Sequence, residues 1–407
     1  MAITVRPLGV DDTSWQRFSR IDALAFYSDD REPAPQHDSG VLEYDRALVA
    51  YDEDQAVGCA SAYSLDLSVP GGSVPTAGVT WVGVVPTARR RGAMTALMRG
   101  LHDQVEAAGR EPLLALWASQ GALYQRFGYG VASFSYIATV PHHLRLAHAP
   151  HGRLDVEQLE TSADREVTRA VYDRVRAVRP GMPHVSDVWY DRNVADPKDD
   201  RDGSSAMRTL VAIDSEGPQG YARVRYQHDW SQGFGDGTVR VIEMVCATPE
   251  AAATLYELML GSDIMRRTRL WNLPEDDPLL TWLDDPKQLE LRRRDQLYLR
   301  LAHVDALALR RYPVPVDAVI AVRDAFQPAN EGRWELAGDA SAATCTRTTR
   351  EPDVTVDVSV LGATYLGSCS WGRLALAGQV EEHRSGAVAA LDAAFRWPTA
   401  GWCPFVF

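Results

Sequence analysis

Residues 79–98, VTWVGVVPTARRRGAMTALM, decide the fold of this chain. An apolar strand pattern runs into Pro86, a basic turn containing glycine follows, and apolar residues then recur at helical spacing. The first N–H groups of a helix lack intrahelical partners and carry the positive end of the helix dipole, and glycine lets an anion approach the backbone closely. Two interpretations stay open from these residues alone: a pyrophosphate-binding turn, or an ordinary basic turn that caps a helix.

Strand and helix patterns alternate on both sides of this segment. We expect strands at residues 47–51, 57–65, 77–85 and 113–117, and helices over residues 12–26 and around residues 94–105. Gly109 stands where a glycine commonly ends a helix. This order predicts a mixed α/β domain.

The pattern returns later in the chain. LVAYD at residues 48–52 has a counterpart in LVAID at residues 210–214, and residues 82–87 resemble residues 241–249. The basic turn is missing from the second copy, which has PEAAA at residues 249–253. The sequence therefore predicts a duplicated domain whose second copy is degenerate.

The last third of the chain has a different pattern. Valines alternate with polar residues over residues 354–360, which predicts a half-buried strand, and we expect short helices starting near residue 363 and over residues 386–395. Residues 395–407 contain five aromatic residues and predict a buried chain end, since chain ends are normally polar. Residues 140–153 are rich in His, Pro and Arg and are interpreted as an interdomain linker rather than a metal site.

Composition excludes several classes of protein. Asp and Glu number 55 against 42 Lys and Arg, a net charge of −13, which argues against nucleic-acid binding and favours cationic ligands. The five cysteines are scattered without C-x-x-C spacing, so we expect neither a structural metal site nor a disulfide scaffold. No apolar run is long enough to span a membrane and no signal peptide is evident, so we expect a cytoplasmic location.

Two motifs and the order of the parts carry a resemblance to a known family. Arg89, Gly92 and Met94 resemble the acetyl-CoA signature R/Q-x-x-G-x-G/A of the GCN5-related N-acetyltransferases, with Met94 in place of the small final residue. Residues 117–130, WASQGALYQRFGYG, and the aromatic tail resemble the enhanced intracellular survival (Eis) branch. The resemblance covers essentially the whole chain.

The resemblance implies an α/β (α+β) fold in three parts. These are an acetyl-CoA-binding acetyltransferase domain at residues 1–148, a degenerate copy at 149–295 and a sterol-carrier-like domain at 296–407, whose end enters the active site. It implies an N-acetyltransferase acting on several amines of aminoglycosides or related polyamines, assembled as a homo-hexamer, a dimer of trimers. Two alternatives are kept: acetylation of protein lysines, and a carrier of hydrophobic ligands with a vestigial acetyltransferase domain.

Acetyl transfer from a thioester needs a neutral amine, a stabilised tetrahedral oxyanion and a proton for the leaving thiolate. Backbone N–H groups near Val82 and Val84 are expected at the carbonyl, and Ser119 either contacts the pantetheine arm or caps a helix. Tyr124 is expected to give the proton, because a phenol has a pKa of about 10; its alternative role is packing on a helix face. The residues expected to hold the pyrophosphate are Arg89, Arg90, Arg91, Gly92 and Ala93.

The resemblance also assigns the base and the acceptor site. In this branch the carboxylate of the last residue, here Phe407, acts as the base; the alternative is that the tail only packs. Phe26, Asp29 and Trp397 are candidates for binding the cationic acceptor, although each also fits an ordinary core or surface position.

Overall fold

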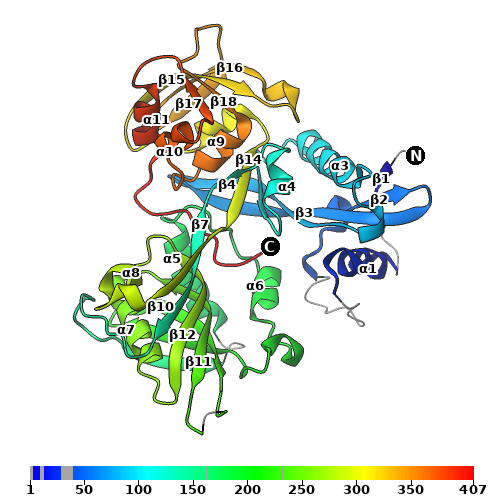
Figure 1. Cartoon of the computed structure of the whole chain (residues 1–407). Helices are drawn as coiled ribbons and strands as arrows, with labels where there is room; N and C mark the ends of the chain where they lie inside the picture. The colour runs from blue at the N-terminus through cyan, green and yellow to red at the C-terminus, as the bar shows by residue number, and fades with distance from the viewer. Residues whose placement is uncertain (1–2, 10–12, 29–39, 161–163, 232) are drawn as a thin grey trace.

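The computed structural model describes residues 3–9, 13–28, 40–160, 164–231 and 233–407, which form three sheets (Figure 1). Across these ranges no helix is long and apolar enough to cross a membrane. Nor do these ranges bring three or more His, Cys, Asp or Glu side chains together as metal ligands.

The first sheet has the strand order β1-β2-β3-β4-β5-β14-β6. Helix α3 packs on β1 to β4, and α1 packs on β3 and β4 from the opposite face (Figure 1). The expected apolar stripe of α3 is buried except for the half-buried Met94, and Gly109 ends the helix with φ 61°. The elements are β1 (Ile3–Pro7), α1 (Ser14–Phe26), β2 (Leu48–Asp52), β3 (Gln55–Val69), β4 (Gly72–Val84), α3 (Ala93–Ala108), β5 (Leu113–Trp117), α4 (Ala122–Gln125) and β6 (Gly130–Val131).

Strands β4 and β5 separate part-way along their length. They pair in parallel from Thr76 with Leu113 to Gly78 with Ala115, and no further pairing joins them beyond that point. The register of β4 against β3 also shifts there, and Trp81 adopts φ 53°, a backbone conformation that L-residues rarely occupy. We call the opening beyond Gly78 the first fork.

The second sheet has the order β13-β7-β12-β11-β10-β9-β8. Strands β9, β10 and β11 followed by α7 and β12 repeat the order β2, β3, β4, α3 and β5, as the duplication predicts. The elements are β7 (Phe134–Pro141), β8 (Asp155–Glu160), α5 (Arg165–Arg176), α6 (Asp187–Val194), β9 (Arg208–Asp214), β10 (Gly217–Gln227), β11 (Gly237–Cys246), α7 (Pro249–Leu260), β12 (Met265–Pro274), α8 (Leu279–Trp282) and β13 (Glu290–Asp295).

Two strands cross the expected domain limits at 148 and 295. Strand β7 joins the second sheet between β12 and β13, while β14 (Leu297–Leu301) joins the first sheet between β5 and β6. The segment at residues 140–153, interpreted above as an interdomain linker, instead connects β7 and β8 of one sheet. Because strand pairing is decided by non-local contacts, local sequence patterns do not reveal this exchange.

The third sheet has the order β17-β16-β15-β18-β19. The predicted strand over residues 354–360 is wrong in its second half, since Asp357 caps a helix there by accepting a hydrogen bond from the Ser359 N–H. That helix, α9, packs on β14 and β6 and is buried almost all round, so alternation could not distinguish it from a strand. The elements are β15 (Val316–Arg323), β16 (Gly332–Gly338), β17 (Ala343–Arg347), β18 (Val354–Asp357), α9 (Val358–Thr364), α10 (Trp371–Leu376), β19 (Val380–Glu382) and α11 (Ala387–Phe395).

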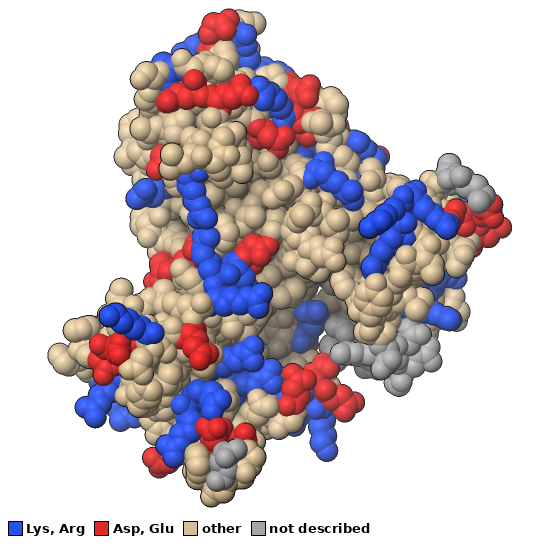
Figure 2. All heavy atoms as spheres, viewed as in Figure 1, with Lys and Arg blue, Asp and Glu red and all other residues tan. Residues whose placement is uncertain are grey.

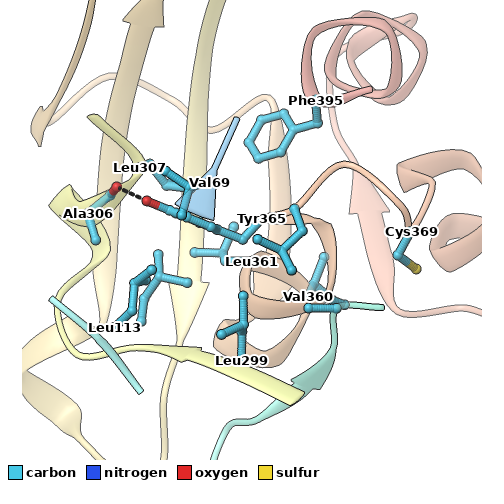
Figure 3. Close-up of a cluster of buried hydrophobic side chains, with 14 of the residues drawn as sticks. Val69, Leu113, Leu299, Ala306, Leu307, Val360, Leu361, Tyr365, Cys369 and Phe395 are labelled. Atoms are coloured by element: carbon cyan, nitrogen blue, oxygen red, sulfur yellow. Dashed lines mark hydrogen bonds between the residues drawn. The ribbon is translucent and has the colours of Figure 1, made fainter. Parts of the chain in front are cut away.

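One hydrophobic core joins the first and third domains. In Figure 3, Leu113 of β5 and Leu299 of β14 lie near Leu361 of α9 and Tyr365, and the Tyr365 hydroxyl donates to the Ala306 carbonyl at 2.9 Å. The chain end leaves this domain and ends between the domains (Figure 1), with Phe407 only 6% exposed, as the aromatic tail predicts.

Candidate active site

A cleft with an empty volume of about 1570 Å³ opens at the first fork. It is bounded by the end of β4, the basic turn, the start of α3 and the segment around α4. Most of the predicted cofactor-binding and catalytic residues line it: Val82, Val84, Arg89, Arg90, Gly92, Ala93, Ser119 and Tyr124, together with Phe26.

The N-terminus of α3 is open toward this cleft. Gly92 occupies the N-cap position with φ 92° and no side-chain cap, and a Cβ built on it meets no atom within 4 Å. The Gly92 carbonyl accepts from the Ala96 N–H at 3.0 Å, which starts the helix, whereas the preceding N–H groups have no intrahelical acceptor. The arrangement suits an anion, since the helix dipole and these N–H groups point the same way.

The three arginines of the turn have different partners. Arg89 donates to the carbonyls of Val84 at 3.2 Å and Ala25 at 2.8 Å and to the Tyr27 hydroxyl at 2.8 Å, so it ties the end of α1 to β4. Arg91 forms an ion pair with Asp52 at 2.7 Å and does not line the cleft. Arg90 lines the cleft and has no hydrogen-bond or ion-pair partner within the described part of the chain.

Tyr124 lies deep on the opposite wall of the cleft. Its side chain is 6% exposed, and burial raises the pKa of its phenol to about 12. Its ring meets that of Tyr129 edge-on, and its hydroxyl has no hydrogen-bond partner among the residues that the structure describes. The phenol is therefore protonated at neutral pH and free to donate to a bound group.

Ser119 lines the cleft between β5 and α4. The N-cap of α4 is Gly121, and no side-chain cap is made there, which leaves the helix-capping alternative for Ser119 without support. Sequence reasoning missed Arg126, which also lines the cleft and whose guanidinium contacts the Met94 sulfur at 3.4 Å. Its signal was its position two residues after Tyr124 on the same segment.

Phe407 lies at the base of the first fork. Its ring carbon Cδ2 is 3.2 Å from the position of a Cβ on Gly78, the last residue at which β4 pairs with β5. Trp81 and Trp117, one from each separating strand, pack against the same apolar cluster. The chain end thus approaches the fork but is not among the residues lining the cleft.

Of the candidate acceptor-binding residues that the structure describes, only Phe26 lines the cleft. Phe26 lines the cleft and is 48% exposed. Trp397 follows α11 and lies against Gly367 in the third domain, away from the cleft-lining residues. Asp29 lies outside the described residues.

Family models match all three domains. An acetyltransferase (GNAT) domain model matches residues 5–132, a second GNAT model matches residues 181–301, and a sterol carrier protein domain model matches residues 304–404. The matches bear out the predicted three-part architecture.

Full-length relatives agree with this assignment. The chain is 41% identical over 371 residues to an uncharacterized N-acetyltransferase of Streptomyces avermitilis, with 90% of each chain covered. It is 33% identical over 349 residues to N-acetyltransferase Eis of Mycobacterium tuberculosis, with 84% of this chain and 83% of that protein covered.

A solved structure is similar over almost the entire length. The crystal structure of Eis1 from Mycobacterium abscessus superposes with a TM-score of 0.85 at 30% identity, covering 99% of this chain and 100% of that one. Architecture, sequence and cleft geometry converge, and the chain belongs to the Eis family of GCN5-related N-acetyltransferases, which use an acyl-CoA as cosubstrate.

Proposed function

We propose that this enzyme transfers acetyl groups from acetyl-CoA to primary amines of aminoglycosides or related polyamines, at several positions of one acceptor. The observation that carries the proposal is the cleft at the first fork, where an open helix N-terminus, an unpaired arginine and a buried neutral phenol share about 1570 Å³. Acetyl-CoA supplies the activated acetyl thioester.

The cleft residues fit the parts of this cosubstrate. Arg90 and the N–H groups at the start of α3 suit the pyrophosphate, since both offer positive charge at the same wall. Backbone groups of Val82 and Val84 suit the thioester carbonyl, because the shifted register at Trp81 interrupts the regular ladder of β4. Arg89 supports the turn through α1, and Ser119, which lines the cleft, is assigned to the pantetheine arm.

Tyr124 and Phe407 divide the proton transfers. Tyr124 holds its proton at neutral pH, because its pKa is about 12, and can give it to a departing thiolate. The terminal carboxylate of Phe407 takes a proton from the acceptor, which arrives as an ammonium ion. The acceptor side, with Phe26 as the candidate that lines the cleft, then binds a cation near a fixed negative charge.

The net negative charge of the chain supports a cationic acceptor. The chain has a net charge of −13. Figure 2 shows acidic and basic side chains interspersed over the face that it displays. Acetylation of protein lysines uses the same chemistry and is the second candidate, because its acceptor is also a primary ammonium.

The third domain gives little support to a carrier of hydrophobic ligands. Its interior is filled by Trp371, Tyr365, Tyr312 and Phe395, all no more than 1% exposed. Buried Arg310 donates to the backbone carbonyls of Thr364, Tyr365 and Phe395, which places a charge where an apolar ligand would need space.

The test is release of free thiol from acetyl-CoA with an aminoglycoside, spermidine or a lysine peptide as acceptor. We expect turnover with the aminoglycoside and mass increments of more than one acetyl group. Turnover with the peptide alone would favour protein acetylation. No turnover with any amine would refute the proposal.

We further propose a closed homo-hexamer built as a dimer of trimers. Trp230, Phe234 and Ile264 are exposed large apolar side chains on adjacent loops of the second domain, 57%, 53% and 45% exposed, as at an interface between copies. Light scattering should give six times the 44.9 kDa chain mass, and a monomer at micromolar concentration would contradict this assembly.

A further inference from the structure

The second copy keeps a fork of its own. Strands β11 and β12 pair in parallel from Gly237 with Met265 to Val241 with Leu270, and no pairing joins them beyond that point. Ile242 to Met244 and Trp271 to Leu273 line a cavity of about 290 Å³ there. This second fork stands where the first fork stands in the first copy.

In the second copy, the turn that corresponds to the cofactor-binding turn of the first copy has lost most of its free N–H donors. Pro249 begins α7 and has no N–H, and the Thr248 hydroxyl accepts from the Ala251 N–H at 3.2 Å. The N-terminus of α7 therefore offers fewer free donors than that of α3, and no arginine stands in residues 248–253. The N-terminus of α7 is therefore poorly suited to binding an anion.

The chain's own tail occupies the second fork. Trp402 and Pro404 line the cavity between the separating strands. The Trp402 indole N–H donates to the Asn272 carbonyl at 3.2 Å, and its backbone N–H donates to the Pro180 carbonyl at 2.8 Å. Gly181, at φ 93°, allows this approach, because a Cβ there would stand 3.0 Å from the Trp402 nitrogen.

Two buried amides hold the next residues. The Gln296 side chain accepts from the Cys403 N–H at 3.0 Å and donates to the Cys403 carbonyl at 2.9 Å, as a neighbouring strand would. Asn272 Nδ2 donates to the carbonyls of Cys403 at 2.9 Å and Pro404 at 3.1 Å.

These two amides are themselves held in place. Gln296 is 1% exposed and Asn272 is 8% exposed. Gln296 Nε2 also donates to Asn272 Oδ1 at 2.7 Å, and the Ser133 hydroxyl donates to Gln296 Oε1 at 2.8 Å. Their orientation is therefore determined by partners outside the tail.

The held segment limits how far Phe407 can reach. Phe407 lies four residues after Cys403, and an extended chain advances at most about 3.5 Å per residue, so Phe407 stays within roughly 14 Å of Cys403. Within that distance Phe407 reaches Gly78 at the first fork.

We propose that the degenerate domain is a tail-holding module: its fork binds residues 402–404 in the place where the first copy has its cofactor cleft, and Asn272 and Gln296 are positioning residues for the terminal carboxylate. The second part rests on the proposed function, in which that carboxylate is the base. A duplicated acetyltransferase domain that lost its coenzyme site has thereby kept its fork for a peptide.

The test uses the full-length chain with Gln296→Leu and Asn272→Leu. Gln227→Leu, at an exposed residue of β10, is the matched control. Hydrogen exchange of the peptide covering residues 400–407 reports whether the tail is held, and peptides from β3 report global stability in the same experiment. We expect exchange of the tail to accelerate by about 5- to 100-fold in both variants, with β3 and the control unchanged, since each variant loses two hydrogen bonds to the tail and each bond is equivalent to about two- to tenfold.

We call the binding of residues 402–404 by Asn272 and Gln296 the clamp. Measurements of activity test the clamp separately from the role of the terminal carboxylate. If the clamp and the role of the terminal carboxylate as base are both right, kcat falls about tenfold or more while the KM for acetyl-CoA stays the same. Faster exchange of the tail together with an unchanged kcat would support the clamp but refute the assignment of the terminal carboxylate as the base. A tail that stays protected in both variants overturns the clamp.

A conservative variant covers the case in which the leucine variants do not fold. Gln296→Glu keeps the shape and the acceptor for the Cys403 N–H but cannot make both donated bonds, since a carboxyl carries at most one O–H donor. We expect faster tail exchange in this variant as well. Unchanged exchange in a folded Gln296→Glu protein would overturn the clamp.

Discussion

The three arginines of the cofactor turn should respond differently to substitution by alanine. Arg90 has no partner within the described residues and lines the cleft, so its loss should remove one charge-assisted hydrogen bond to a pyrophosphate. Such bonds contribute about 1.5–3 kcal/mol each, and 1.4 kcal/mol is a factor of ten in Kd. We expect Arg90→Ala to weaken acetyl-CoA binding by about 10- to 150-fold without lowering stability.

Arg91→Ala is the matched control within the same turn. Its side chain is 58% exposed and paired with Asp52, and exposed ion pairs contribute at most about 1 kcal/mol. Arg89→Ala should instead lower stability, because the three hydrogen bonds by which Arg89 links the end of α1 to β4 disappear.

Titration calorimetry with coenzyme A and thermal unfolding of each variant separate these cases. Equal losses of affinity in Arg90→Ala and Arg91→Ala would show that the turn acts only through its net charge, and the individual assignments would be wrong.

Four further outcomes are expected. Tyr124→Phe should lower turnover by about 10²- to 10⁴-fold with unchanged acetyl-CoA affinity in calorimetry, because the ring remains and only the acid is lost. Burial, with Arg300 and Arg99 nearby, lowers the pKa of His102 to about 3, so between pH 3 and 6.5 the unfolded chain binds a proton that the folded chain does not. The contribution of His102 to stability is therefore complete above about pH 6.5 and is lost as the pH falls toward 3, and the urea midpoint of His102→Gln should depend less on pH in that window. Residues added after Phe407 should abolish turnover in the thiol assay but leave calorimetric binding of coenzyme A intact. A chain ending at residue 295 lacks β14, an interior strand of the first sheet, and should melt by circular dichroism at a lower temperature than the full chain, because only the second sheet keeps all its strands.

The strand, turn and helix beside the first fork could be predicted because their signals are local. Pro86 ends the strand pattern, Gly92 marks the positive φ before the helix, and the apolar spacing of α3 identifies its buried face. Duplication was readable for the same reason, since the two copies share short strand motifs.

The different roles of Arg89, Arg90 and Arg91 could not be predicted from the sequence. Arg89 is engaged by Ala25 and Tyr27 and Arg91 by Asp52, residues far away in the chain that the fold alone brings near. The sequence showed three equivalent charges, whereas the structure leaves one of them free for a ligand. Helix α9 was missed for a related reason: burial on nearly all sides removes the polar face that distinguishes a helix from a strand.

The cleft of the first domain depends on residues near the other end of the chain. Strand β14 pairs with β5 from Leu297 with Trp117 to Leu301 with Leu113, and so fixes the strand that forms one side of the first fork. Arg300 of β14 is fully buried, donates to the Phe127 carbonyl beyond α4 at 2.6 Å, and pairs with Asp324 at 2.6 Å. Removing one partner of such a buried pair costs about 3–5 kcal/mol, so β14 is firmly attached to both domains.

Helix α9 then lies on β14 and β6 so closely that Gly130 and Gly362 have no room for a side chain. A third domain used in this way needs a solid interior rather than a ligand cavity, because a cavity beneath α9 would loosen β14, and with it the spacing between β4 and β5 on which the cleft depends. Its filled aromatic core is therefore part of the architecture of the acetyltransferase site.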